Sequence, residues 1–187
     1  EGTNIVKTRL ASGEMADLCF FNSGSLFKSL NPEKYFADLS KYEWSKKISP
    51  SFREAVSIDG KIYGIPSGSS SAGAVMYNKK IYEKYNLSVP HTWKDFIKNC
   101  EVIKNGGDTA IIGTFKDAWT SQVLFLGDSY NICSKLPNFP KDFESGVSKY
   151  ENTPLALKSF EKISDTKPFY NKDYLAAGYI DGVQMLA

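Results

Sequence analysis

Several residue types that carry chemistry are scarce in this sequence. Of its 187 residues only one is a histidine and three are cysteines. Long gaps separate Cys19, Cys100 and Cys133, a spacing that fits neither a zinc site nor a disulfide framework. His91 lies in a connector before a helix start, which predicts a surface residue. We therefore expect no metal site and no cofactor, and we expect Cys19 and Cys100 to be buried free thiols.

Long hydrophobic runs and a strong charge of one sign are also missing. No run of about 18 apolar residues occurs, so the sequence predicts no transmembrane helix. The net charge of +2 gives no electrostatic reason to expect nucleic acid or a membrane surface as a partner. The motifs of serine hydrolases, phosphate-binding loops and dinucleotide-binding loops are absent. A glycan-acting enzyme stays open, because the separation of paired carboxylates is a property of the fold.

Neither end of the sequence has the pattern of a natural terminus. It begins at Glu1 without a methionine, and no signal peptide is visible. It ends in an apolar helical pattern, 183–187, without a capping residue. We therefore expect that segments on both sides, including a signal peptide, lie outside this sequence.

The stretch from Ile58 to Lys79 organises the chain. Asp59-Gly60 between short runs of β-formers predicts a two-residue hairpin turn, in which both positions need a positive φ. Strands are predicted over 62–65 and 74–77, on either side of a loop of serines and glycines at 67–73. Such a loop can surround a polar ligand with hydroxyls and amides, although it can equally be an ordinary connection between core strands.

Two further apolar runs are typical of buried parallel strands. They cover 17–21 and 109–113, and each is followed by a polar turn, at 22–25 and at 114–117 respectively. Open α/β sheets bind ligands where the carboxyl ends of strands lead into such turns. These turns are therefore candidate ligand-binding positions.

Helical patterns alternate with these strands. Thr92 predicts the cap of the clearest amphipathic helix, which runs to Asn105. Other helices are predicted over 5–12 and 118–130, and from about Leu26, Pro32, Pro50, Asn78, Thr153 and Leu175. The alternation of strands and helices predicts an α/β fold class.

Four stretches, in order, resemble segments of family 1 extracellular solute-binding proteins. Gly60-Lys61-Ile62-Tyr63-Gly64-Ile65-Pro66 followed by Met76-Tyr77-Asn78-Lys79 resembles the family's "GK-x-YG-x-P … YNK" pattern. The segment 6–21 resembles its "ASG-x-x-PDL" pattern, with Ala16 in place of the usual proline. The segment 89–96 resembles "P-x-TW-x-x-F", and 179–187 resembles the helix before the chain returns to the first lobe.

The resemblance implies a two-lobe, periplasmic-binding-protein-like fold of type II, present here only in part. Residues 1–77 would form part of lobe one and residues 78–187 most of lobe two, with a hinge crossing at Tyr77 and Asn78. Family members are longer, so this sequence would be truncated at both ends.

The resemblance also implies a function that changes no bonds. The protein would capture a sugar or oligosaccharide between the lobes and deliver it to the permease of an ABC transporter. It would be extracellular, at the cell surface or periplasmic, and would reach the membrane only through a lipid anchor outside this segment. The alternatives are a binding protein for a non-sugar solute, such as a polyamine, an iron complex or a peptide, and a glycan-acting enzyme.

Six residues are candidates for ligand binding because of their places in the polar turns and the central loop. They are Asn22, Ser23, Ser70, Ser71, Asp117 and Trp119. The alternative role for each is a loop cap or a core aromatic. Trp44 and Trp93 are predicted to be packing residues, Trp93 because it begins the apolar face of a helix.

Overall fold

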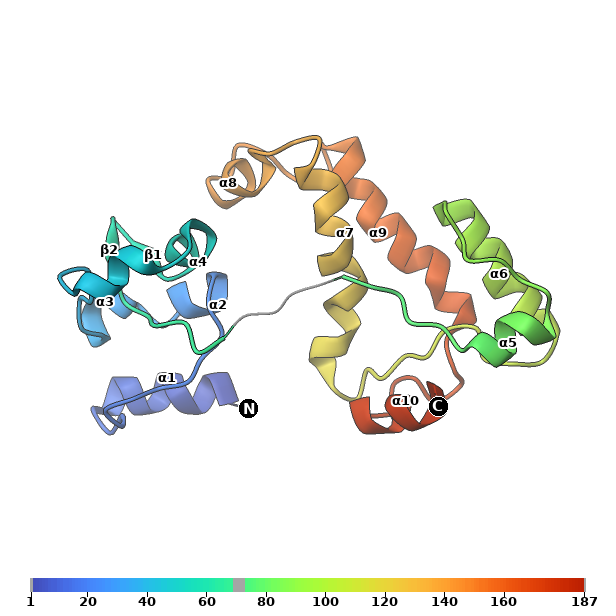
Figure 1. Ribbon diagram of the computed structural model, residues 1–187, viewed down its shortest axis with the longest axis horizontal. Helices are drawn as coiled ribbons and strands as arrows, with labels where there is room; N and C mark the ends of the chain where they lie inside the picture. Colours follow the sequence, from blue (N-terminus) through green and yellow to red (C-terminus); the bar gives the residue numbers. More distant parts are fainter. Residues whose placement is uncertain (1, 69–72, 187) are drawn as a thin grey trace. The chain divides into compact units, whose positions relative to one another are not determined.

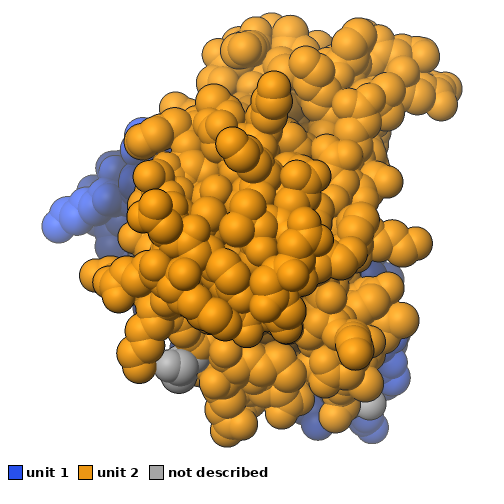
Figure 2. All heavy atoms as spheres, turned by 90° about the vertical axis from the view of Figure 1, so that its right-hand side faces the viewer, with its two compact units in different colours: residues 1–70 blue, residues 71–187 orange. Residues whose placement is uncertain are grey.

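The computed structural model describes residues 2–68 and 73–186 of the chain (Figure 1). The chain divides into two units, Glu1–Ser70 and Ser71–Ala187, which Figure 2 distinguishes by colour. We describe each unit by itself. The first unit contains α1 (Gly2–Ser12), α2 (Ser25–Lys28), α3 (Pro32–Tyr35), the 3₁₀ helix η1 (Glu43–Lys47), α4 (Pro50–Ala55), β1 (Ser57–Ile58) and β2 (Lys61–Ile62).

The predicted hairpin in the first unit is confirmed. Strands β1 and β2 pair antiparallel, with Ser57 opposite Ile62 and Ile58 opposite Lys61. Asp59 and Gly60 form the turn with φ values of 50° and 77°, as a two-residue turn of this hand requires. The second strand ends at Ile62, earlier than the predicted 62–65.

The hairpin carries part of the hydrophobic core of the first unit. Ile62 and Tyr63 are buried together with Phe27 from α2 and Val56, which follows α4. Partly buried side chains surround this cluster: Phe36, Leu39, Ile48, Phe52 and Ile58. The elements are too short to be stable alone, so burial of this apolar area is what holds them together.

The predicted buried strand over 17–21 is wrong. The segment forms neither helix nor strand, and Leu18 and Phe20 are 85% and 86% exposed. Cys19 is only half-buried, so its predicted burial is wrong as well. A strand needs neighbours that accept its backbone hydrogen bonds, and none of the described segments pairs with this one.

The second unit is helical over most of its length (Figure 1). It contains α5 (Lys79–Lys84), α6 (Trp93–Asn105), the 3₁₀ helix η2 (Ala118–Gln122), α7 (Val123–Cys133), α8 (Phe139–Glu144), α9 (Pro154–Thr166), the 3₁₀ helix η3 (Lys167–Phe169) and α10 (Tyr179–Leu186). The amphipathic helix predicted from Thr92 is confirmed: the Thr92 hydroxyl accepts a hydrogen bond from the Asp95 amide at 3.1 Å and donates to its carboxylate at 2.7 Å. Cys100 is buried on the inner face, as predicted.

The two strands predicted in the second unit are wrong as strands. Residues 74–77 form no ladder, and Val75 and Met76 are exposed. The 109–113 run makes one isolated parallel bridge, from Ile111 to Tyr170. Among the described residues, β1 and β2 make up the one sheet, so the α/β alternation is present only in part.

Three helix predictions differ from the structure at their bounds. The helix predicted over 5–12 begins at Gly2. The helix predicted over 118–130 begins as the 3₁₀ helix η2 and continues as α7 to Cys133. The last helix begins at Tyr179 rather than at Leu175, because the residues before it form turns.

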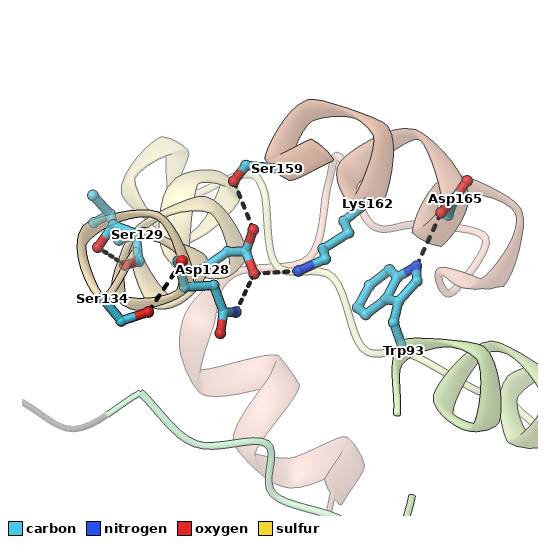
Figure 3. A network of polar contacts seen from close by, with 9 residues as sticks. Trp93, Asp128, Ser129, Ser134, Ser159, Lys162 and Asp165 are labelled. Atoms are coloured by element: carbon cyan, nitrogen blue, oxygen red, sulfur yellow. Dashed lines mark hydrogen bonds and ion pairs between the residues drawn. The ribbon is translucent and has the colours of Figure 1, made fainter. Parts of the chain in front are cut away.

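A buried carboxylate joins the two long helices α7 and α9 (Figure 3). Asp128 of α7 is 8% exposed. Its carboxylate accepts hydrogen bonds from the Ser159 hydroxyl and the Asn131 amide, both at 2.6 Å, and from the Lys162 ammonium. The Lys162 ammonium also lies 5.5 Å from the centroid of the Trp93 ring, which connects α6 to the same network.

The pKa of Asp128 follows from this environment. Burial alone would raise the pKa, because it disfavours the charged form, but the hydrogen bonds from Lys162, Ser159 and Asn131 outweigh it. The net result is a pKa below the ordinary value for aspartate. The ionised form is therefore bound more tightly in the folded state than in the unfolded one, and its contribution to stability is present above the unfolded-state pKa of about 4.

Replacement of Asp128 by alanine should destabilise the protein by about 3 kcal/mol at pH 7, because Lys162 and Ser159 lose their buried partner. We place the value at the low end for buried pairs because the Lys162 side chain is 21% exposed. As the pH falls below about 4 and through the lowered folded-state pKa, the difference from wild type should shrink. Urea melts at pH 7, 5, 4 and 3 measure both effects.

The matched control is Glu151→Ala, which removes the carboxylate of an exposed pair with Lys149 in the same unit. It should unfold close to wild type at every pH. Equal losses in the two variants would contradict a special role for the buried carboxylate.

The hairpin turn supports a second prediction. Gly60→Val should destabilise by about 1 to 2 kcal/mol, because a β-branched residue is strained at positive φ. Gly60→Asn should lose clearly less, since asparagine adopts the left-handed conformation more readily. Denaturant melts of the two variants decide it, and equal losses would show that φ is not the cause.

Candidate functional site

Two segments of the second unit that are distant in sequence run side by side. We call them the 111–117 segment and the 169–179 segment. Backbone hydrogen bonds join them at successive points: Ile111 N to Phe169 O (3.0 Å), Asn171 N to Ile111 O (3.2 Å), Phe115 N to Tyr174 O (2.7 Å) and Lys116 N to Ala177 O (3.2 Å). These bonds hold the two segments against one another along their length. We call the paired segments, 111–117 and 169–179, the support.

Side chains reinforce this support at its buried end. The carbonyl of the Asn171 side chain accepts from the Gly113 amide at 2.6 Å, where a sheet would have a backbone partner. Because a side chain takes the place of a backbone acceptor here, the run over 109–113 makes one bridge and then leaves the strand conformation. The Phe115 ring packs edge-on against Tyr170 and Tyr174, with ring centroids 5.0 and 5.4 Å away. The contacts of Phe115 hold the middle of the two segments together.

The support ends in an exposed aromatic pair. The rings of Trp119, on η2, and Tyr179, the first residue of α10, have centroids 5.5 Å apart and planes inclined by 44°. Trp119 is 55% exposed and Tyr179 49% exposed. Two large rings held this open to solvent present the apolar surface on which a ligand ring can stack.

Asp117 lies at the junction of the two elements that carry these rings. One of its carboxylate oxygens accepts the amide hydrogen of Tyr179 at 2.7 Å. Its backbone carbonyl accepts from the Thr120 amide at 2.9 Å and from the Thr120 hydroxyl at 3.0 Å. The same hydroxyl lies 2.8 Å from the Thr114 carbonyl. Asp117 therefore connects the turn before Trp119 to the start of α10.

Helix α10 approaches the 111–117 segment closely at Gly182. A Cβ atom placed there would lie 2.3 Å from Cγ2 of Thr114 and 3.3 Å from Cγ2 of Ile112. Thr114 is buried, and its β-branched side chain has little freedom to move away. Glycine at this position thus lets the helix, and with it Tyr179, reach its place beside Trp119.

The predicted hinge residue Asn78 contacts both ends of the second unit. Its side-chain oxygen caps α5 by accepting from the Lys80 amide at 2.9 Å. Its side-chain amide donates to the carbonyl of Leu186, at the end of α10, at 3.0 Å. The Tyr77 ring packs on Tyr82 of α5, with centroids 4.5 Å apart. The chain is therefore anchored where the hinge is predicted.

The six residues predicted for ligand binding fall in three places. Asp117 and Trp119 lie together in the second unit, beside Tyr179. Asn22 and Ser23 are exposed just before α2, in the first unit. Ser70 and Ser71 lie outside the described residues. Which of the six contact a ligand stays a prediction.

Sequence reasoning missed Tyr179, which it assigned only to a helix. The available signal was an aromatic residue at the start of that helix, two positions before the acidic Asp181. Trp44 and Trp93 have packing contacts, as predicted: Trp44 stacks on Tyr42 with centroids 5.9 Å apart, and the Trp93 indole nitrogen donates to Asp165 at 3.0 Å (Figure 3). His91 is exposed, also as predicted.

The described residues also bear on metal binding and on membrane crossing. Within residues 2–68 and 73–186, no group of three or more histidine, cysteine, aspartate or glutamate side chains is placed to hold a metal ion. In the same part of the chain, no helix has both the length and the apolar character that a membrane crossing requires.

The family of the chain follows from its sequence. Residues 2–183 match the family model of the bacterial extracellular solute-binding proteins. Because the match covers nearly the whole chain, the chain belongs to this family. The resemblance drawn from the four short motifs is thereby confirmed.

Particular relatives carry more specific names. The multiple sugar-binding protein of Streptococcus mutans is 27% identical over 119 residues, 62% of this chain and 28% of the relative. The melibiose/raffinose/stachyose-binding protein of Bacillus subtilis is 28% identical over 148 residues, 72% of this chain and 34% of the relative. An ABC transporter extracellular-binding protein of Pyrococcus horikoshii is 36% identical over 75 residues, 40% of this chain and 15% of the relative. The matches thus span about a third or less of these relatives.

A solved structure shares the fold. A chitin oligosaccharide binding protein superposes with a TM-score of 0.69 and covers 95% of this chain and 44% of its own. The sequence identity is 22%, so the similarity shows the fold alone. The chain therefore has part of the fold of a solute-binding protein.

The close approach of α10 can be tested at Gly182. Gly182→Ala should destabilise by about 1 to 3 kcal/mol, because the added methyl group overpacks a buried contact with Thr114. The control is Gly127→Ala in α7, where a Cβ would meet nothing within 4 Å. That change should be neutral or should stabilise by about 0.5 to 1 kcal/mol, because alanine suits a helix better than glycine. Thermal and urea melts measure both, and equal effects would contradict the close contact.

Proposed function

We propose that this chain is part of an extracellular protein that binds a sugar or oligosaccharide and delivers it to the permease of an ABC transporter. The single observation that carries the proposal is the exposed pair Trp119 and Tyr179 on its hydrogen-bonded support. Membership of the solute-binding family and the sugar-binding names of two relatives agree with it.

The chemistry of sugars suits such a pair. A pyranose ring has an apolar face of C–H groups and a rim of hydroxyls, so it stacks on an aromatic ring while polar groups bind its edge. Trp119 would form the stacking surface. Asn22, Ser23, Ser70 and Ser71 are the candidates for hydrogen bonds to hydroxyls. No bond of the ligand is broken, so the unchanged sugar is what a binding assay should recover.

The family suggests how the complete protein is organised. We infer two lobes of type II, with residues 1–77 in lobe one and 78–187 in lobe two, and the ligand between them. Tyr77 and Asn78 would form a hinge crossing. The anchoring of Asn78 by the Lys80 amide and the Leu186 carbonyl supports this role, because a hinge needs a rigid element on which to turn.

The proposed location follows from the function. A protein that passes a solute to a permease must work outside the cytoplasmic membrane, in the periplasm or at the cell surface. A lipid anchor outside this segment would be its link to the membrane. Globomycin-sensitive processing of the full-length precursor, followed by mass spectrometry, would distinguish a lipoprotein from a free protein.

Stacking on Trp119 gives the direct test. Trp119→Ala should weaken binding of raffinose, stachyose or a chitin oligosaccharide by about 1 to 3 kcal/mol, the scale of a stacked aromatic anchor. Trp119→Phe should lose less, because a ring remains. Isothermal calorimetry on the full-length protein measures the affinities.

The control for this experiment is Trp93→Phe, which alters a tryptophan that packs against α9 through Asp165. It should leave the affinity unchanged. Unchanged affinity in Trp119→Ala would contradict the stacking role. Binding of a polyamine, a peptide or an iron complex in place of every sugar would move the function to a non-sugar solute, and turnover of the sugar would indicate an enzyme.

A further inference from the structure

Two carboxylates meet the N-terminus of α10, and they come from different parts of the chain. Asp181 belongs to the helix and accepts the Gly178 amide at 2.8 Å. Asp117 lies 62 positions from Tyr179 in sequence and accepts its amide at 2.7 Å. A Cβ at Gly178 would lie 3.2 Å from Oδ2 of Asp117 and 3.4 Å from Oδ2 of Asp181. The two acids therefore converge on one turn but connect different elements.

The bond from Asp117 acts on the residue that carries one ring of the aromatic pair. Its donor is the backbone of Tyr179, and its acceptor lies two residues before Trp119. The carbonyl of Asp117 is in turn fixed by Thr120. A charged acceptor at a helix N-terminus makes a stronger bond than a neutral one. This contact therefore links the residue that carries one ring to the turn that precedes the other.

We propose that Asp117 is a positioning residue, which joins Trp119 and Tyr179 into one aromatic platform instead of contacting the sugar itself. The inference rests on the proposed function, because it assigns roles within the same binding site. Tyr179 then becomes a second ring of the ligand platform. Asp181, which accepts only within its own turn, has no such effect on Trp119.

The position of Trp119 can be observed without any ligand. In full-length protein labelled with 5-fluorotryptophan, the ¹⁹F resonance of Trp119 is the one that disappears in Trp119→Phe. Asp117→Ala should shift this resonance, and Tyr179→Ala should shift it as well, because each change separates the two rings. Asp117→Asn should keep the wild-type shift, since its amide oxygen can still accept the Tyr179 amide hydrogen. Asp181→Ala is the matched control and should also keep it.

The two changes should not add. In a Tyr179→Ala background, Asp117→Ala should produce no further shift of the Trp119 resonance, because the partner ring is already gone. A full additional shift would overturn the proposal, since Asp117 would then act on Trp119 by another route. Circular dichroism confirms that each variant is folded, and Asp117→Asn supplies the test should Asp117→Ala unfold.

Sugar affinities of the Asp117 variants distinguish a positioning role of Asp117 from direct contact with the sugar. Calorimetry with raffinose, stachyose or a chitin oligosaccharide should show a loss of about tenfold for Asp117→Ala, the effect of about 1.4 kcal/mol. Asp117→Asn and Asp181→Ala should stay within about threefold of wild type, below 0.7 kcal/mol. If Asp117→Asn loses as much as Asp117→Ala while the Trp119 resonance stays in place, the carboxylate binds the ligand and the proposal is wrong.

The experiments distinguish a failure of sugar binding from a failure of the positioning role of Asp117. If the wild-type protein binds none of these sugars, the proposed function fails, while the resonance of Trp119 still reports whether Asp117 holds the ring pair. If the sugars bind and the resonance is unmoved in Asp117→Ala, the proposed function survives and the positioning role is overturned.

Discussion

The series of backbone hydrogen bonds between the 111–117 and 169–179 segments is the constraint on which the second unit depends. These segments are far apart in sequence, so bringing them together costs chain entropy that local contacts cannot repay. The bonds themselves, the Phe115 contacts with Tyr170 and Tyr174, and the close approach at Gly182 offset that cost. Asp117, Trp119 and Tyr179, which form the candidate site, lie at the end of this support.

A second constraint acts on the helices behind the site. Helices α7 and α9 enclose Asp128, a charge that would be costly to bury without partners. Ser159, Asn131 and Lys162 supply them, and Lys162 extends the network to the Trp93 ring. Since α7 follows η2 without a break, the helix that contains Asp128 also holds the element that bears Trp119. The buried charge and the exposed ring are thus parts of one framework.

The sequence predicted local features well wherever a few neighbouring residues decide the conformation. The Asp59-Gly60 turn and the Thr92 cap are such cases, and the structure confirms both. The strand predictions over 17–21, 74–77 and 109–113 failed, because a strand depends on partners elsewhere in the chain. The run predicted as a strand over 17–21 is rich in apolar residues, yet Leu18 and Phe20 are exposed, since no described segment pairs with it.

The same distinction between local and long-range features applies to the candidate site. The sequence by itself determined the membership of the solute-binding family, because the motifs that identify it are short and can be read without the fold. It also identified Asp117 and Trp119 as residues in or next to a polar turn. It did not identify Tyr179, 60 residues further on. Only the tertiary structure decided that the Tyr179 amide meets Asp117 and that the two rings lie 5.5 Å apart. Local sequence determines turns and caps through φ preferences and short hydrogen bonds, whereas this pairing depends on how the 169–179 segment docks against the 111–117 segment.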